Sequence, residues 1–314
     1  MVWGILVVVV FFTILNPSFL SFRNIENILT DSSVLLIVSI GMTMSILSEQ
    51  IDMSVGGTAT LGGMVAGLYM QQFENPSAMQ IFICIVIGIL VGTAVGVFNG
   101  VMIGKFKYDF WLITFATMSV TFGLSQVVTG GNVISGFSRN FRNVSNYELL
   151  GVPMIVFIAA VVSAVVIFAL RGTRFGMHVY AVGDSEMCAG LSGINVKSIR
   201  TIIYVISGAA AGFAGVLLAA QTNSASPISG SGYEFDAMAA VIIGGTPFEG
   251  GKGGFGGTVI GALIISALTN GLLTIGLSTY VQQVLIGVFI LSIIVFSVLS
   301  EAKKNKNGLR RVYK

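Results

Sequence analysis

Apolar segments close to membrane-spanning length recur from one end of this chain to the other. The hydrocarbon core of a bilayer is about 30 Å thick, so each helix that crosses it needs about 20 apolar residues. Only 9% of the 314 residues are charged, whereas soluble domains typically carry about 25%. We therefore predict an all-α integral membrane protein of about ten transmembrane helices, forming one transmembrane domain over residues 1–314. The predicted spans are 2–15, 33–48, 53–70, 80–103, 110–128, 152–170, 201–220, 235–247, 255–276 and 279–299.

Two of these segments are unusual. The segment at 235–247 is too short to cross alone, so we expect it to be buried among other helices. The segment at 2–15 is short and has no basic residue before it. A cleaved signal is the alternative, but Asn16-Pro17-Ser18-Phe19 follows in place of a small-residue cleavage pattern. We interpret this segment as a first membrane helix that lacks part of its N-terminal side.

Basic residues indicate which ends of the spans face the cytoplasm, because cytoplasmic loops carry an excess of Lys and Arg. The loop at 171–200 and the tail at 300–314 are both rich in them, and four predicted spans separate the two. Lys105 and Lys107 fall on the same side. Arg139 and Arg142 are exceptions in an outer segment, 130–150, which suits docking of another protein. Both termini are thus expected in the cytoplasm.

Small residues at four-residue spacing mark the expected helix contacts, because glycine lets helix backbones approach closely. The pattern predicts three glycine ridges, each used for packing rather than as part of a pore. They consist of Gly88, Gly92, Gly96 and Gly100; of Gly253, Gly257 and Gly261; and of Gly208, Gly212 and Gly215 with Ala211.

The glycine-rich stretch from Gly245 to Gly254 resembles nucleotide-binding loops only superficially. A phosphate-binding loop needs Gly, four residues, then Gly-Lys-Ser/Thr. Here Thr246 occupies the first glycine position and Gly253 replaces the hydroxyl residue. A Gly-x-Gly-x-x-Gly match beginning at Gly251 joins two membrane spans instead of a strand and a helix. We predict that this stretch is a sharp cytoplasmic turn and not a nucleotide site. Any nucleotide hydrolysis that drives this protein would then take place on another polypeptide.

The loop at 180–196 carries the most information about function. Asp184 or Ser185 can cap a short helix from Glu186 to Leu191, and Gly193 can end it. This helix either simply connects two membrane helices or transmits a rigid-body movement from a soluble, energy-supplying partner protein. Its composition alone leaves these two interpretations open.

Three stretches resemble the permeases of ribose-type ATP-binding-cassette (ABC) sugar importers. The loop at 180–196 is similar to their coupling-helix motif, although Asp184 and Ser185 depart from its usual Gly-Asn. Residues 49–57 resemble their Gly-Ile-Asp-Leu-Ser-Val-Gly signature, with Gln50 where glycine is usual. Residues 232–261 resemble their long C-terminal signature. The matching residues include Gly183, Glu186, Ala189, Leu191, Ser192 and Gly193 in the loop, Asp52, Ser54 and Gly56 in the first signature, and Glu234, Asp236, Gly244 and Gly245 in the last.

The resemblance implies a vitamin B12 importer-like (type II) ABC permease fold in the bacterial inner membrane. It also implies a second permease copy (identical or a paralogue), an ABC ATPase subunit that binds ATP and magnesium, and a periplasmic solute-binding protein that delivers a small sugar. On this interpretation the chain has no catalytic residue, metal or cofactor of its own, its surroundings are lipid, and no nucleic acid is involved. The six matching loop residues would couple it to the ATPase.

A sugar path needs weak hydrogen-bonding groups among aromatic walls, although helix packing explains each such residue equally well. The candidates are Asn99, Phe110, Thr114, Phe115, Gln126, Gln221, Asn223 and Asn270. The acidic residues are expected at span ends within reach of water. There, Asp52 would cap a helix beginning at Met53, and Asp109 would pair with Lys105 or Lys107. Glu234 and Asp236 would favour the positive end of the short helix after them.

Other classes of protein fit less well. An ion-coupled secondary transporter should carry acidic residues inside the membrane on interrupted helices. A membrane-embedded enzyme should have a set of catalytic groups, whereas the chain has a single histidine, His178, and two isolated cysteines. Within the ABC class, the alternative substrates are autoinducer-2, a nucleoside or a branched-chain amino acid.

Overall fold

The computed structural model describes residues 2–278, 281–282, 284–289, 291–292 and 295. The described chain is mainly helical, as predicted for an all-α membrane protein. Its longer helices are α1 (Val2–Leu15), α2 (Phe22–Leu47), α3 (Val55–Met70), α4 (Ala78–Gly100), α5 (Phe110–Thr129), α7 (Met154–Gly172), α10 (Val196–Thr222) and α12 (Phe255–Thr274). The shorter ones are α6 (Arg139–Asn146), α8 (Arg174–Asp184), α9 (Glu186–Leu191) and α11 (Tyr233–Ile243), with η1 at Pro17–Leu20 and a π-helical turn, η2, at Val101–Lys105.

Within the described residues, six helices are long and apolar enough to cross a membrane: α2, α4 with η2, α5, α7, α10 and α12. Three further predicted spans correspond to α1, α3 and α11, which have 14, 16 and 11 residues. The predicted span at 279–299 is interrupted by undescribed residues, and the basic tail at 300–314 lies wholly outside them. The multi-pass helical character is confirmed, and the number ten stays a prediction.

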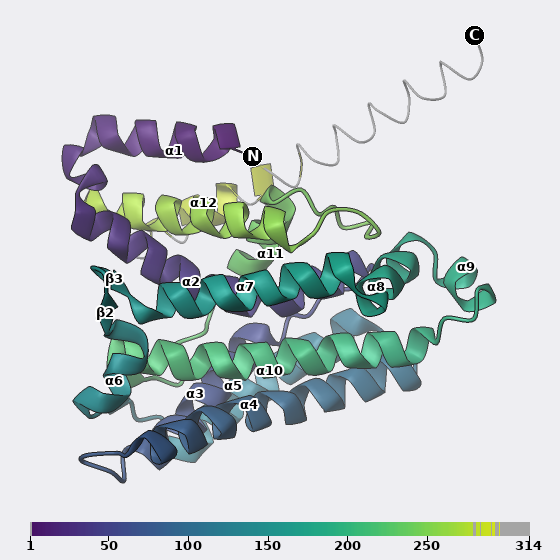
Figure 1. The fold of residues 1–314 in the computed structure, drawn as a ribbon, viewed down its shortest axis with the longest axis horizontal. Coiled ribbons are helices and arrows are strands. Elements are labelled where there is room, and N and C mark those ends of the chain that lie inside the picture. The colour runs from purple at the N-terminus through teal and green to yellow at the C-terminus, as the bar shows by residue number, and fades with distance from the viewer. Residues whose placement is uncertain (1, 279–280, 283, 290, 293–294, 296–314) are drawn as a thin grey trace.

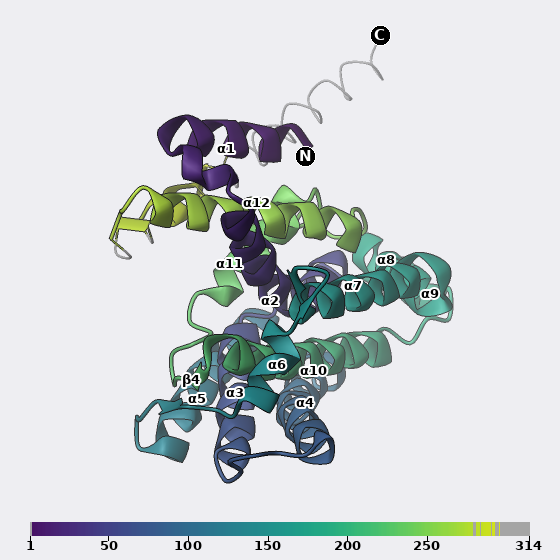
Figure 2. The same ribbon diagram turned by 60° about the vertical axis from the view of Figure 1, so that its left-hand side comes forward.

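Helix α2 runs through the middle of the molecule (Figures 1 and 2). It packs against α10, α12, α11 and α7, and every residue from Ser32 to Leu47 is buried. From Ser32 onward α2 is therefore covered on all sides and forms the centre of the helix bundle. The outer helices α4 and α7 instead expose large apolar side chains, including Leu90, Val161 and Phe168, which suits contact with lipid.

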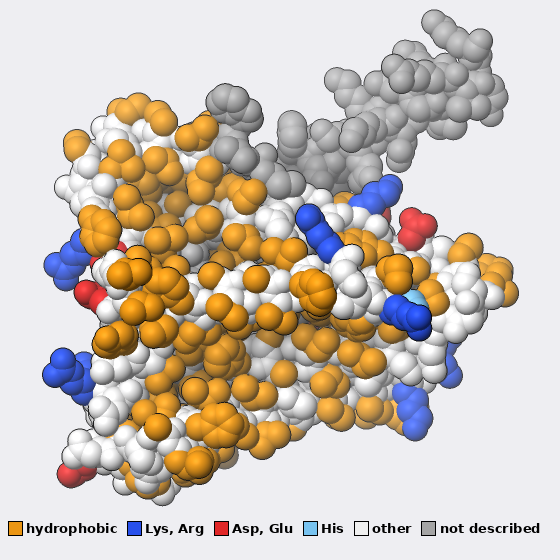
Figure 3. Space-filling model, viewed as in Figure 1, with side chains coloured by type: hydrophobic (Ala, Val, Ile, Leu, Met, Phe, Trp, Pro, Cys, Tyr) orange, Lys and Arg blue, Asp and Glu red, His pale blue; other side chains and the backbone are white. Residues whose placement is uncertain are grey.

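The polar segments gather at the two opposite ends of the bundle. Helices α8 and α9 lie at one end, and α6 lies at the other with two short antiparallel ladders (Figure 1). These ladders pair β1 (Ile134–Ser135) with β4 (Ser224–Ala225), and β2 (Glu148–Leu149) with β3 (Val152–Pro153). Lys and Arg side chains also collect at the two ends, and apolar side chains cover much of the face between them (Figure 3). Because basic residues lie at both ends, they do not decide which end faces the cytoplasm, and the predicted orientation stays a prediction. We call the end with α9 the cytoplasmic end and the end with α6 the outer end, following that prediction.

Glycine ridges join the helices in pairs. A Cβ added at Gly92 would collide with the carbonyl of Gly208, and one added at Gly208 would collide with the carbonyl of Gly92. Gly96 faces the carbonyl of Tyr204 and Gly212 faces the carbonyl of Gly88, so the first predicted ridge packs against Gly208 and Gly212 of the third. We call this contact of α4 with α10 the glycine seam. Gly215 of the third ridge packs instead against the carbonyl of Ala59 on α3. The second ridge packs α12 against α11, because Gly257 contacts the carbonyl of Gly244. Gly253, which was predicted to belong to the second ridge, is not part of the contact between α11 and α12. It lies in the preceding loop against Thr246.

Two helices were not distinguished from the sequence. Helix α6 lies in the outer segment and carries both Arg139 and Arg142, with the buried Phe141 facing the bundle. Helix α8 occupies Arg174–Asp184, so the predicted coupling loop is a pair of helices rather than one short helix in an irregular connection. Both are short and amphipathic, and apolar run length therefore does not reveal them.

Candidate functional site

The short helix α9 forms at the bounds expected for it. The Ser185 hydroxyl accepts a hydrogen bond of 3.2 Å from the backbone N–H of Cys188, which caps the helix start. Gly193 follows the helix end with φ of +83°, a conformation that favours glycine. Ala189 faces inward, whereas Met187 and Leu191 are 76% and 80% exposed. Helix α9 therefore presents two apolar side chains at the cytoplasmic end of the bundle.

An ion pair ties α9 to the start of α10. Glu186 Oε2 lies 2.9 Å from Arg200 Nη1. Both groups are near the surface, so the pair contributes little to stability. The ion pair instead helps to fix the orientation of the short helix α9 relative to the long helix α10.

The three signature stretches meet at what we call the cytoplasmic junction: the end of α2 at residues 47–50, the end of α8, and the loop at 250–254. Gly251 N–H donates a hydrogen bond of 3.0 Å to the carbonyl of Leu47. Gly183 packs against the same carbonyl, with no room for a Cβ. The Tyr180 hydroxyl donates to the carbonyl of Gly253 over 3.0 Å. Burial raises the pKa of that hydroxyl, so it stays protonated at physiological pH and remains a donor.

The loop between α11 and α12 makes the sharp turn predicted from its glycines. Gly245, Gly250, Gly251 and Gly253 all have φ between +66° and +104°. A residue with a Cβ is strained in this region. The resemblance to a phosphate-binding loop therefore reflects the needs of a tight turn.

Five polar side chains form a buried network where α3, α4, α5 and α10 meet. Asp52 Oδ1 accepts from the Ser54 hydroxyl at 2.6 Å, and Asp52 Oδ2 accepts from the Ser207 hydroxyl at 2.6 Å. Asn99 Nδ2 donates to Ser54 Oγ at 2.9 Å, and the Thr117 hydroxyl donates to Asn99 Oδ1 at 2.7 Å. We call these residues the buried polar network. It connects four helices through groups that would be costly to leave unpaired.

The roles predicted for two acidic residues are wrong. Asp52 does not cap a helix at Met53, because Ile51–Met53 are not helical and α3 begins only at Val55. Its side chain is 2% exposed and hydrogen-bonded within the network. Asp109 does not pair with Lys105 or Lys107. It caps α5 instead, accepting from the N–H groups of Trp111 and Leu112 at 2.9 and 3.2 Å.

Glu234 and Asp236 do lie in the first turn of α11, at its positive end, as predicted. Helix α11 is also buried, as its short length required. Glu234, however, is only 4% exposed. Its carboxylate packs against Gly56, and nearby Gly230 N–H donates to the Thr60 hydroxyl at 2.9 Å. The outer loop therefore reaches into the bundle as far as the start of α3.

Asp52 and Glu234 were expected at the ends of membrane spans, within reach of water. Their burial contradicts that expectation. An ion-coupled carrier is expected to have acidic residues inside the membrane, and these two are buried among the helices. The placement of these acids no longer distinguishes that class from an ABC permease.

The eight candidate path residues do not line one cavity. Asn99 and Thr114 are buried between helices, whereas Phe115 and Gln126 lie on the exposed face of α5. Gln221 donates to Asp31 Oδ1 at 3.0 Å near the outer end of α10, which Asn223 terminates. Asn270 is buried in α12. Only Phe110 borders the cavity described next.

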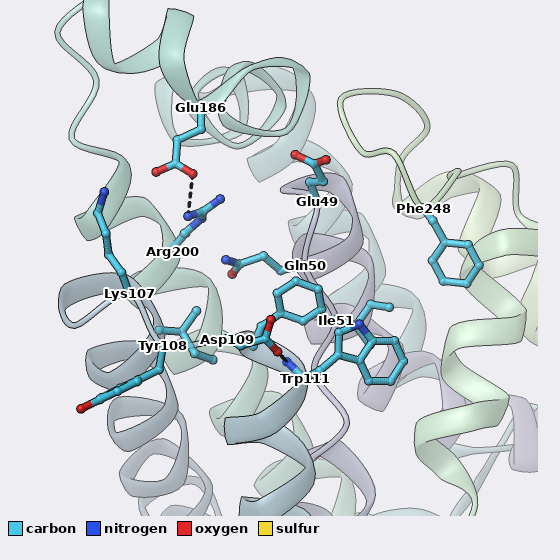
Figure 4. Close-up of a pocket in the computed structure, with 12 residues that line it drawn as sticks. Glu49, Gln50, Ile51, Lys107, Tyr108, Asp109, Trp111, Glu186, Arg200 and Phe248 are labelled. Atoms are coloured by element: carbon cyan, nitrogen blue, oxygen red, sulfur yellow. Dashed lines mark hydrogen bonds and ion pairs between the residues drawn. The ribbon is translucent and has the colours of Figure 1, made fainter.

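An open cavity of about 720 Å³ lies beside α9 at the cytoplasmic end. We call it the cytoplasmic cavity. Gln50 lies between a charged side, with Lys107, Glu186 and Arg200, and an aromatic side, with Trp111 and Phe248 (Figure 4). No sequence pattern pointed to this cavity, because its walls come from four separate parts of the chain.

Comparison with known proteins adds an independent finding. The model of a family described as branched-chain amino acid transport system / permease component matches residues 24–294. The ribose import permease protein of Haemophilus influenzae is 38% identical over 264 residues, which cover 83% of this chain and 80% of the relative. That of Bacillus subtilis is 37% identical over 305 residues, covering 96% and 92%. The D-allose transport system permease protein of Escherichia coli is 36% identical over 259 residues, covering 82% and 78%. No solved structure matches the chain.

Proposed function

Because this chain belongs to the permease-component family of branched-chain amino acid transport systems, we propose that it forms the membrane path of an ATP-driven importer for a ribose-like monosaccharide. It is a multi-pass protein of the bacterial inner membrane. The observation that carries the proposal is the agreement of the coupling motif with an exposed helix at the cytoplasmic end. The names of the relatives support a sugar, since relatives for ribose and for D-allose are 38% and 36% identical to this chain.

In this proposal, a partner ABC ATPase binds ATP and magnesium and docks on α9 through Met187 and Leu191. Both side chains are apolar and exposed, so burying them against a partner would contribute free energy through the hydrophobic effect. Movement of α9 would be transmitted in two directions. Glu186 and Arg200 connect it to α10, which is locked to α4 by the glycine seam. Helix α8 connects it to the cytoplasmic junction, and so to α2 and α12.

The proposed assembly contains a second permease copy and a periplasmic binding protein. Helix α5 is the proposed contact between the copies, because Thr114, Thr117, Thr121 and Ser125 are buried while its aromatic residues Trp111 and Phe115 are 46% and 56% exposed. The outer segment with α6 is the proposed contact for the binding protein. The sugar would then cross between the two copies by alternating access, within a vitamin B12 importer-like fold of ten spans.

The coupling role can be tested at Leu191. We expect Leu191→Arg to lower sugar uptake about tenfold or more, because loss of about 1.4 kcal/mol of docking energy has that effect. The measurement is uptake by proteoliposomes that contain the permease, its ATPase and its binding protein. Leu191→Met is the matched control, since it keeps an apolar side chain of similar volume, and its uptake should stay near the wild-type level. Undiminished transport by Leu191→Arg would reject the coupling role.

The substrate is tested by measuring which sugar, presented on the binding protein, stimulates ATP hydrolysis by the same assembly. Ribose, allose and galactose should be compared with a nucleoside and a branched-chain amino acid. Stimulation by an aldose is the expected result. Solute movement without any ATPase would instead support the ion-coupled carrier.

A further inference from the structure

We propose that the cytoplasmic cavity is a second, low-affinity site for a neutral monosaccharide, reached from the inside of the cell and centred on Gln50. The choice of ligand rests on the proposed function. The site itself rests on the lining of the cavity.

Two buried polar atoms in this lining have no hydrogen-bond partner: Oε1 of Gln50 and Nε of Arg200. Gln50 is 4% exposed, and the Arg200 side chain is 15% exposed while its Nη1 is held by Glu186. One atom is an acceptor and the other is a donor. A sugar hydroxyl is both donor and acceptor, so a polyhydroxylated ligand can satisfy each of them. Leaving such groups unpaired is costly.

The shape of the cavity suits the same ligand. Its volume of about 720 Å³ lies within the range of small-molecule sites, about 300–1,000 Å³. Gln50 extends between the charged side and the aromatic side formed by Trp111 and Phe248 (Figure 4). An apolar wall facing a small set of polar groups is the usual arrangement of a site that orients one ligand.

Charge argues for a neutral ligand. The lining contains three carboxylates, from Glu49, Asp109 and Glu186, and two cations, from Lys107 and Arg200. The carboxylate of Asp109 already caps α5, and Arg200 is already paired with Glu186. A phosphorylated sugar would therefore meet a lining with one excess negative charge, whereas a free aldose meets no net penalty.

A glycine at position 50 would remove the acceptor and leave the aromatic wall in place.

The test uses the fluorescence of Trp111. The chain has two tryptophans, so a Trp3→Phe background leaves Trp111 as the single reporter in the full-length permease in lipid nanodiscs. D-ribose and D-allose should quench it saturably in the millimolar range. Gln50→Gly should weaken this binding about tenfold, the usual effect of losing one satisfied buried hydrogen bond. Gln72→Gly is the matched control, because Gln72 is exposed at the opposite end of the molecule, and it should bind as the parent does.

Several outcomes would overturn the site. These are the absence of saturable quenching, equal affinity in Gln50→Gly, or tighter binding of D-ribose 5-phosphate than of D-ribose. An unchanged melting temperature of Gln50→Gly shows that the variant is folded. Uptake by the assembled importer separates this inference from the proposed function. If the importer takes up the sugar but the sugar does not quench Trp111 fluorescence, the cavity site is rejected and the proposed function stands. If the sugar quenches Trp111 but the importer takes up no aldose, the proposed function is rejected and the cavity site stands.

Discussion

Thr114 and Thr117 lie one turn apart on α5, and both are buried, but their hydroxyls have different roles. Thr114 bonds only to the carbonyl of Phe110 in its own helix, at 2.7 Å. Thr117 instead donates to Asn99 on α4. A hydrogen bond within a helix turn adds little to helix association, whereas one between helices joins two elements.

Replacing each threonine by valine should separate these two roles. We expect Thr117→Val to lower the free energy of unfolding by about 1 kcal/mol, because Asn99 Oδ1 is left buried without a donor. Thr114→Val should change it by less than half of that amount. Thermal unfolding of the purified permease in detergent measures both. Equal losses would show that the buried polar network does not hold α4 against α5.

The hydrogen bonds of the buried polar network could not be predicted from the sequence. Asn99 was identified as a polar residue in an apolar helix, but its partners could not be. Asp52 is bonded to Ser207, which lies 155 positions further along the chain. The apolar run around Asp52 also looks the same whether its backbone is helical or extended. This is why the start of α3 was placed two residues too early.

At the scale of elements, the glycine seam between α4 and α10 sets how closely the two helices approach. Gly92 has the backbone of Gly208 directly against it, whereas Gly123 on α5 has nothing within 4 Å of where a Cβ would stand. Both are glycines within membrane helices, and the sequence does not distinguish them.

These two glycines form a matched pair for substitution. Gly92→Ala should destabilise the permease by about 1–3 kcal/mol, because the backbones must separate to admit a methyl group. Gly123→Ala should be neutral or stabilising by up to about 1 kcal/mol, because alanine favours the helix. Melting temperatures in detergent give the comparison. A loss at Gly123 as large as that at Gly92 would contradict the seam.

Element positions followed well from hydropathy where helices are long and apolar, as for α4, α7 and α12. The boundaries of α9 also followed, because Ser185 and Gly193 act through local rules of helix capping. Helix α8 was missed, since its pattern is set by packing on α7 and α2. The burial of Glu234 was missed for the same reason, because the glycine against it, Gly56, is on another helix.

At the scale of the whole molecule, the two natural cysteines report on orientation. Cys188 lies on α9 and is exposed, whereas Cys84 is buried in α4. A thiol reagent that cannot cross membranes should therefore label Cys188 from the cytoplasmic side only.

We expect labelling of inside-out vesicles and none of intact spheroplasts, with Cys188→Ser removing the signal. A cysteine placed at Asn132, which is exposed at the outer end, should show the reverse pattern in a cysteine-free background. Labelling of Cys188 from outside would invert the orientation and remove the basis for ATPase docking on α9.

The seam between α4 and α10 also limits how this protein can change over generations. When two side chains clash, a smaller residue on one helix can compensate for a larger residue on the other. Here each glycine faces a carbonyl oxygen, and every amino acid brings that oxygen with it. No substitution at position 208 can therefore make room for a larger residue at position 92. Suppressors of such a change must arise where the two helices can tilt apart as whole bodies.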